Sequence, residues 1–260
     1  MASSLDRVLA VLGVFSEDRL EWGFDALMAE LGYSRPTLYR YIRTLKEAGF
    51  LIALPGARFT LGPKVVELDY LMWRADPLVR ESGQTLDGLI GRWSCTALLV
   101  RWYGKRLLCV ASATSMDNPV SSYPRGKPMP LARGAISRAI LAFLPRRRQI
   151  PMIADHLEDL RAIGLGDTVD EVADALRRIK RQGYTSARGE VTPGVIGIAA
   201  PVFQDGADPA AALCVTLRET DIAPEDIPRI GTQIRHAADE LSLRLSMQDG
   251  TSDAAGSQGE

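Results

Sequence analysis

The polar side chains between Ser34 and Phe50 (SRPTLYRYIRTLKEAGF) form the stretch of this chain best suited to bind a polyanion. Arginine guanidinium groups can contact phosphates or guanine edges, and threonine and tyrosine hydroxyls add further backbone or base contacts. The residues of this run that we expect to contact DNA are Ser34, Arg35, Thr37, Tyr39, Arg40, Arg43 and Thr44. Farther along the chain, Arg58 is expected to add a phosphate contact.

A helix is required to present these side chains together, and the same run predicts one. Its apolar residues recur at helical spacing and give one buried face: Leu38, Ile42 and Leu45. Ser34 is expected to cap the helix, with its hydroxyl accepting a hydrogen bond from a first-turn amide. Pro36 then falls in the first turn, where its missing N–H is not needed, and Gly49 is expected to end the helix.

The flanking segments complete a winged helix-turn-helix. Phe24 to Leu31 (FDALMAEL) has one apolar face and is followed by a Gly32-Tyr33 turn, so two short helices are joined as in a helix-turn-helix. Leu51 to Leu54 and Arg58 to Leu61, separated by Pro-Gly-Ala, predict a short hairpin that would form the wing.

The distribution of charge favours DNA binding over a merely solvated helix face. From Tyr33 to Lys64 there are six basic residues and one acid, whereas Met1 to Gly32 holds two basic residues and six acids. The net charge of the whole chain is only −1, so any attraction to nucleic acid must be local. The positive charge coincides with the predicted recognition helix and wing.

Two further helices are predicted around this unit. The first is expected to bury a stripe made of Leu5, Val8, Leu9, Leu12 and Phe15. The second, a linker helix from Lys64 to Arg74, has apolar residues on more than one face, including Val66, Tyr70 and Trp73. Packing on a partner subunit and packing on its own domain are equally compatible with this pattern.

The remainder of the chain alternates helical patterns with strands linked in hairpins, which predicts an antiparallel sheet flanked by helices. The fold class is therefore α+β. We predict a winged helix-turn-helix domain over residues 1–63, a linker helix over 64–75, a second domain over 76–247 and a small, polar, disordered tail over 248–260.

Composition argues for a cytoplasmic protein. Three widely spaced cysteines suit a reducing compartment better than a disulfide framework. No apolar run is long enough to predict a membrane span, and the N-terminus lacks the pattern of a secretion signal.

The residue pattern does not favour an enzyme. His156 and His236 lie on predicted helices without a matching nucleophile motif, and Gly164-x-Gly166 follows a helix and lacks a third glycine. Cys214 is a lone strand cysteine, which is more often a small buried residue. We therefore expect no catalytic residues, no metal site and no cofactor.

Taken together, the chain resembles the IclR family of bacterial transcription regulators. Arg35-Pro36-Thr37-Leu38-Tyr39-Arg40 resembles the family's recognition-helix run. The segment GYTSARGEVTPGVIGIAAPVFQDG, with Gly189-Glu190 and Ala200-Pro201-Val202, resembles the signature of its effector domain. The chain departs from the family where His is replaced by Ala132 and Gly-Lys by Ser137-Arg138, and Ile136 stands where a small residue is common.

This resemblance implies a PAS/GAF-like effector domain that binds a small organic or aromatic acid, in a regulator that binds operator DNA as a homodimer or homotetramer. By position, the effector-binding residues would be Ala135, Ile136, Glu190, Gly197, Cys214 and Thr216. Cys214 and Thr216 are two apart and share a strand face, so a thiol and a hydroxyl would orient a polar ligand. The alternatives are that both are ordinary strand residues, and that the second domain docks a protein instead.

Overall fold

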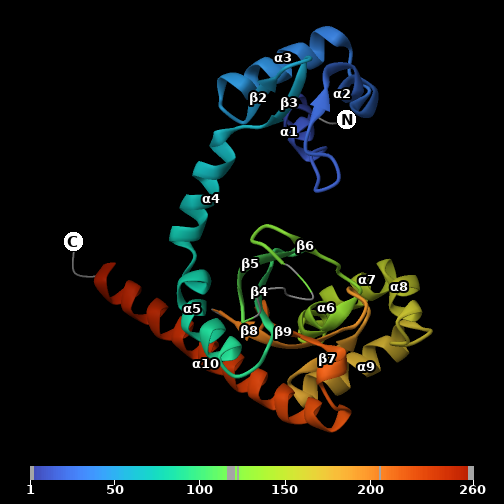
Figure 1. Ribbon diagram of the computed structural model, residues 1–260, viewed down its shortest axis with the longest axis vertical. Coiled ribbons are helices and arrows are strands. Elements are labelled where there is room, and N and C mark those ends of the chain that lie inside the picture. Colours follow the sequence, from blue (N-terminus) through green and yellow to red (C-terminus); the bar gives the residue numbers. More distant parts are fainter. Residues whose placement is uncertain (1–2, 116–120, 122, 205, 257–260) are drawn as a thin grey trace. The chain divides into compact units, whose positions relative to one another are not determined.

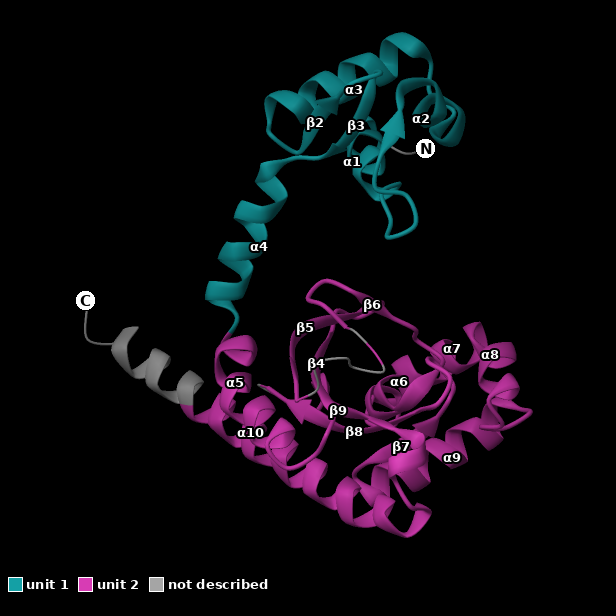
Figure 2. Ribbon diagram, in the orientation of Figure 1, with its two compact units in different colours: residues 1–76 teal, residues 77–260 magenta. Residues whose placement is uncertain are grey.

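The computed structural model describes residues 3–115, 121, 123–204 and 206–256 (Figure 1). The chain divides into two compact units, Met1–Asp76 and Pro77–Glu260, which Figure 2 distinguishes by colour. The helix expected to serve as a linker is counted with the first unit.

The first unit is a winged helix-turn-helix, which confirms the predicted fold. Its helices are α1 (Ser4–Gly13), α2 (Phe24–Leu31), α3 (Arg35–Glu47) and α4 (Pro63–Ala75). The strands β1 (Trp22–Gly23), β2 (Leu51–Leu54) and β3 (Arg58–Leu61) form an antiparallel sheet in the order β1-β3-β2. Gly32 ends α2 in the left-handed conformation (φ 65°), which glycine adopts without steric cost, so the chain turns directly toward α3.

Two local details of this unit differ from the expectations. The sheet has an additional strand, β1, which the sequence did not predict, because two residues are too few to show a strand period. The stripe predicted for the first helix is only partly right: Val8, Leu12 and Phe15 pack against the core, but Leu5 and Leu9 are exposed and Val11 is buried instead. Val8, Val11, Leu12 and Phe15 also have helical spacing, and the core contributed by α2 and α3 selects that face.

The second unit is built on a six-stranded antiparallel sheet, in the order β6-β5-β4-β9-β8-β7. Its strands are β4 (Thr96–Trp102), β5 (Leu107–Thr114), β6 (Pro128–Met129), β7 (Thr185–Arg188), β8 (Val195–Phe203) and β9 (Pro209–Arg218). Its helices are α5 (Pro77–Ile90), α6 (Gly134–Leu141), α7 (Arg146–Asp155), α8 (Leu157–Ala162), α9 (Val169–Gln182) and α10 (Ile227–Gly256), with short 3-10 turns at Glu219–Asp221 and Pro224–Asp226.

Two hydrophobic cores lie on the two faces of this sheet (Figure 1). One core joins the sheet to α5 and α10, and the other joins it to α6, α7, α8 and α9. Alternate residues of β9 serve the two cores, so Leu213 and Val215 face one side and Ala212 and Cys214 face the other. This alternation places Cys214 on the same side as α6.

The last helix ends later than expected. α10 continues to Gly256 rather than stopping near Met247, so the segment predicted to be disordered from residue 248 is helical up to that point. Extending an existing helix adds one hydrogen bond per ordered residue, and this segment contains no proline to stop it. Residues 257–260 lie outside the described residues.

Candidate functional site

The helix α3 presents most of the predicted DNA-contacting side chains to solvent. Its buried face is formed by Leu38, Tyr41, Ile42 and Leu45. On the remaining surface, Ser34, Arg35, Tyr39, Arg40, Arg43 and Thr44 are exposed, and Thr37 is half-buried. Arg58, at the start of β3 in the wing, is exposed as well. The predicted residues therefore share the solvent side of the helix and the wing.

Three of the four arginines are held in ion pairs at the surface. Arg35 contacts Asp25 (2.6 Å), Arg43 contacts Glu47 (2.8 Å) and Arg58 contacts Glu21 (2.6 Å). Exposed pairs of this kind contribute only about 0.2–1 kcal/mol, so a phosphate can replace the carboxylate at little cost. These pairs orient the guanidinium groups and still leave them able to bind DNA phosphates.

The hydroxyls at this surface have local partners that sequence reasoning did not foresee. Ser34 does occupy the N-cap position, but its hydroxyl donates to Oγ1 of Thr37 (2.9 Å) and does not accept from a first-turn amide. The Thr44 hydroxyl donates to the carbonyl oxygen of Arg40 (3.1 Å). The capping expectation for Ser34 is therefore wrong: its hydroxyl bonds to the Thr37 hydroxyl, and Pro36 in the first turn has no amide hydrogen to offer.

A broad surface groove runs along α3 and adds Lys46 to the candidate residues. Arg35, Tyr39, Arg43 and Lys46 follow one another at intervals of four, four and three residues, so they lie on one face of the helix. The groove also contacts side chains of α2 and the wing, namely Phe24, Asp25, Ala57 and Phe59. The helical spacing in the sequence was sufficient to identify Lys46 as a further candidate for DNA contact.

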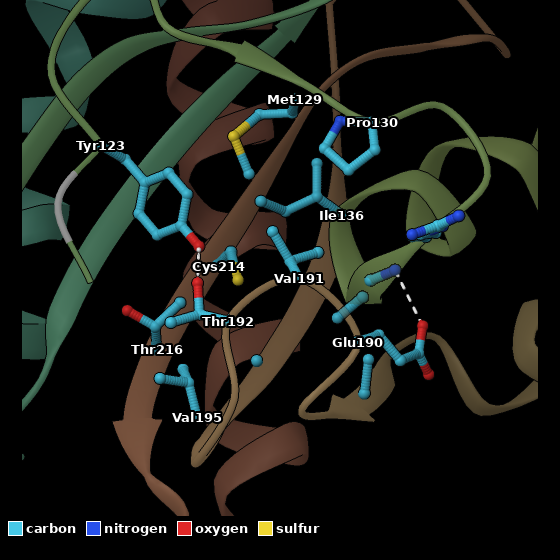
Figure 3. Close-up of a pocket in the computed structure, with 15 residues that line it drawn as sticks. Tyr123, Met129, Pro130, Ile136, Glu190, Val191, Thr192, Val195, Cys214 and Thr216 are labelled. Carbon is cyan, nitrogen blue, oxygen red and sulfur yellow. Dashed lines mark hydrogen bonds between the residues drawn. The ribbon is translucent and has the colours of Figure 1, made fainter. Parts of the chain in front are cut away.

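In the second unit, all six residues expected to bind an effector line one cavity, which Figure 3 shows in close-up. Ala135 and Ile136 belong to the first turn of α6, and Glu190 lies in the connection between β7 and β8. Gly197 on β8 and Thr216 on β9 are direct partners across the two strands, and Cys214 precedes Thr216 on the same face. The cavity encloses about 440 Å³, part of it open to solvent.

Glu190 is held in place by α6. Its carboxylate accepts a hydrogen bond from the Gly134 amide (2.9 Å) and forms an ion pair with Arg138, one turn farther along the helix. Arg138 also donates to the carbonyl oxygen of Ser186 (3.0 Å) on β7. The side chains of Arg138 and Glu190 are only 10% and 14% exposed, so this pair is largely shielded from solvent. It joins α6 to the segment that carries Glu190.

The hydroxyl of Thr216, which was expected to be available to a polar ligand, already has protein partners. It shares a hydrogen bond with the Ser121 hydroxyl (2.9 Å) and donates to the carbonyl oxygen of Thr96 (3.3 Å). The neighbouring thiol of Cys214 donates to the carbonyl oxygen of Val215 (3.4 Å). Burial raises the pKa of the Cys214 thiol far above its usual range, so it stays protonated and is not an activated nucleophile.

Further lining residues were not singled out from the sequence. They are Tyr123, Met129, Pro130, Arg133, Gly134, Ala187, Val191, Thr192 and Val195. Val191 to Val195 directly follow Glu190 in the signature segment, so their neighbourhood in the sequence was a usable signal. Tyr123 to Gly134 lie mostly in a Pro- and Gly-rich connection without periodicity, and only the folded chain brings that connection to the cavity.

Other kinds of site are not found in the described ranges. Among these residues, no group of three or more His, Cys, Asp or Glu side chains is placed to hold a metal ion. The three cysteines are buried and free, and burial raises the pKa of the Cys95 and Cys109 thiols to about 11. Within the same ranges, no helix combines the length and the apolar character needed to cross a membrane.

Comparison with known families and proteins points to one group. The family model described as "Bacterial transcriptional regulator IclR C-terminal" matches residues 75–243, and the "IclR helix-turn-helix domain" model matches residues 4–53. The transcriptional regulator KdgR of Escherichia coli is 25% identical over 251 residues, covering 95% of this chain and 94% of its own. The transcriptional repressor IclR of the same organism is 22% identical over 255 residues, covering 92% and 89%.

Solved structures share the fold. An IclR family transcriptional regulator from Brucella abortus superposes with a TM-score of 0.78 at 18% identity, covering 94% of this chain and 93% of its own. An IclR-type regulator from Alicyclobacillus acidocaldarius gives a TM-score of 0.74 at 21% identity, covering 94% and 98%. The arrangement of a winged helix-turn-helix followed by a helix-flanked antiparallel sheet is therefore common to these proteins.

Proposed function

The chain belongs to the IclR family of bacterial DNA-binding transcriptional regulators, and on that premise we propose that a small organic or aromatic acid in the cavity of the second unit controls its operator affinity. We call this cavity, lined by the fifteen residues given above, the effector cavity. The observation that carries the proposal is the convergence of six residues from separate segments of the chain on one cavity. Its lining combines mostly apolar side chains with a few polar groups, which is typical of small-molecule sites.

The start of α6 supports an acidic ligand. The first amides of a helix have no acceptor within the helix, and the helix dipole favours negative charge there. Arg133, at the N-cap of α6, gives it no side-chain cap, while Ala135 and Ile136 of its first turn line the effector cavity. The Gly134 amide already donates to Glu190, so the amides left for a ligand carboxylate are those of Ala135 and Ile136. This feature favours a metabolite over a protein partner for the effector cavity.

Control of DNA binding requires the two units to be coupled. Effector can change operator affinity only if it binds unequally to two arrangements of the DNA-binding units. The helix α4 is the covalent connection between the winged helix-turn-helix and the second unit. We propose that α4 transmits the effect of effector binding from the second unit to the winged helix-turn-helix.

A Gly197→Ala substitution tests whether the acid binds in the effector cavity. A Cβ at Gly197 would lie 3.7 Å from Cβ of Ala135 and 3.8 Å from Sγ of Cys214, which are ordinary contacts. The unliganded variant should therefore unfold at nearly the wild-type temperature, but its added methyl takes up space needed by the ligand. In a thermal-shift screen of organic and aromatic acids, the wild type should be stabilised and the variant should lose most of that stabilisation.

Gly83→Ala serves as the matched control, because Gly83 is exposed on α5 and a Cβ there meets no neighbouring atom within 4 Å. It should keep the full ligand response. Equal stabilisation of wild type and Gly197→Ala by the same acid would place its binding site elsewhere. A lack of response to every acid would favour the alternative in which the second unit docks a protein.

We also propose that the regulator is a homodimer through α4, possessing two recognition helices for two operator half-sites. No side chain of α4, which is described throughout, is buried, and Val66, Tyr70 and Trp73 are all exposed. Exposed apolar area of this extent on one helix is typical of an interaction surface. Sedimentation at micromolar concentration should give a dimer, or a tetramer if dimers pair.

Replacing both Tyr70 and Trp73 with aspartate should shift that sedimentation equilibrium toward the monomer. Glu67→Gln provides a control on the same helix, because Glu67 is already polar and pairs at the surface with Lys64. A wild-type protein that sediments as a monomer while binding operator DNA would contradict the proposal.

A further inference from the structure

We infer that the acid taken by the effector cavity is a monocarboxylic acid with an apolar body, and that Val191 is the side chain that selects it. The inference rests on the proposed function, because it names the ligand class of the same cavity. Three observations carry it: the hydroxyl groups of the lining have protein partners, the charged groups of the lining are already paired, and Val191 forms a fixed apolar wall.

The hydroxyl groups of the lining are bonded within the protein. Thr216 is engaged with Ser121 and with the carbonyl oxygen of Thr96. The hydroxyl of Tyr123 shares a hydrogen bond of 3.1 Å with that of Thr192, drawn as a dashed line in Figure 3. The Thr216 proton is committed to the carbonyl oxygen of Thr96, and Tyr123 and Thr192 use one of their two protons to bond to each other. This part of the lining therefore offers few donors to a ligand hydroxyl or keto group, whereas an apolar body needs none.

The charged groups of the lining are likewise occupied. Glu190 is neutralised by Arg138 and by the Gly134 amide. Arg133 is about half exposed and forms an ion pair with Asp159 (2.9 Å). Arg133 and Glu190 are the charged residues of the described lining, and neither is an unpaired, buried cation. A second acidic group on the ligand would therefore lack a counter-ion there. One carboxylate at the first turn of α6 is what this site can accommodate.

Val191 is unusual because it is a large apolar side chain that is 41% exposed and yet lines the cavity. Figure 3 shows it among Ile136, Cys214 and Thr192. One of its methyl carbons, Cγ2, lies only 2.9 Å from the place that a Cβ on Gly134 would take, so valine packs directly on the first residue of α6. Its exposed surface is available to a ligand that enters beside α6.

The neighbours of Val191 hold it in this position. Glu190 is bound to α6 through Arg138 and Gly134, and Thr192 is bound to Tyr123. The segment is bounded by Gly189 and Gly194, whose φ angles of 63° and 73° reverse the chain on either side. Because the residues before and after Val191 are both anchored, its side chain is a preorganised wall that defines the shape of the site.

The test compares acids that differ in the polarity of their bodies and in their number of carboxylates. Phenylacetate and 4-methylpentanoate carry one carboxylate and an apolar body, whereas glycerate and pyruvate carry one carboxylate and a polar body, and malonate carries two carboxylates. Calorimetric titration of the full-length protein should give affinities at least about tenfold higher for the first pair, which corresponds to 1.4 kcal/mol.

Two variants test the role of Val191. Val191→Ala removes the wall, so the ratio of the affinity for 2-naphthylacetate to that for phenylacetate should rise at least about fivefold. Val191→Thr keeps the shape and adds a hydroxyl, so affinity for phenylacetate should fall about three- to tenfold. Leu243→Ala, at an exposed position of α10, is the matched control and should alter neither value.

The outcomes separate the inference from the proposed function. Binding of glycerate, pyruvate or malonate as tight as that of phenylacetate would overturn the apolar-body assignment while leaving an acid-binding cavity intact. An unchanged naphthylacetate ratio in Val191→Ala, together with unchanged phenylacetate affinity in Val191→Thr, would overturn the role of Val191. Failure of every acid to bind the wild type would overturn both the inference and the proposed function.

Discussion

Replacing Arg138 with methionine is expected to lower the free energy of unfolding of the second unit by about 3–5 kcal/mol. Methionine keeps most of the length and apolar stem of the side chain but removes the guanidinium group that pairs with Glu190. The Glu190 carboxylate, only 14% exposed, would then keep its hydrogen bond from the Gly134 amide but lose its cationic partner. The loss is large because an uncompensated charge remains in a shielded site.

Chemical denaturation of wild type and variants measures this effect. Adding Glu190→Gln to Arg138→Met removes the stranded charge, so the double variant should regain a substantial part of the stability lost in the single variant. The control is Arg229→Met, which removes an arginine whose pair with Asp226 is exposed and should cost at most about 1 kcal/mol. Equal free energies of unfolding for Arg138→Met and Arg229→Met would contradict the prediction, because the Arg138–Glu190 pair would then contribute no more than an exposed pair.

Substituting Arg35 or Arg43 with alanine is expected to weaken operator binding by about 1–3 kcal/mol per half-site, and by about twice that in a dimer that occupies two half-sites. The two residues are eight positions apart on α3 and so lie two turns along nearly one face. Their present partners, Asp25 and Glu47, form exposed ion pairs whose loss should barely change folding stability. The affinity change therefore reports on DNA contact.

Titrations with operator and with random DNA at several salt concentrations distinguish the two kinds of contact. Loss of a base contact should weaken operator binding and reduce the preference over random DNA, whereas loss of a phosphate contact should weaken both and lower the salt slope by about one. Arg229→Ala, an exposed arginine in the other unit, should leave DNA binding unchanged. Unaltered affinity in both Arg35→Ala and Arg43→Ala would show that α3 is not the recognition helix.

Local periodicity was sufficient to recognise most helices and strands. In α3 the apolar spacing of Leu38, Ile42 and Leu45 and the position of Pro36 defined a helix whose observed bounds are Arg35–Glu47. Such features depend on neighbours within a turn or two, so they can be read without knowing the tertiary fold. Helix α1 shows where local periodicity is insufficient, because two overlapping sets of apolar residues both had helical spacing. Packing against α2 and α3 decided that Val11 rather than Leu9 is buried.

The identity of six of the fifteen residues around the effector cavity was likewise accessible from the chain, through the family resemblance and the two-residue period of β9. Their environment was not, since it depends on contacts between segments far apart in the sequence. Arg138 and Glu190 are separated by 52 positions, and Ser121 and Thr216 by 95. The sequence thus determined six of the side chains that surround the cavity, but tertiary structure alone decided that the other nine join them, that Thr216 and Glu190 bond to the protein and that Val191 lines the cavity. Hydrogen-bond and ion-pair partners are decided by distances of a few ångströms, which a linear pattern does not contain.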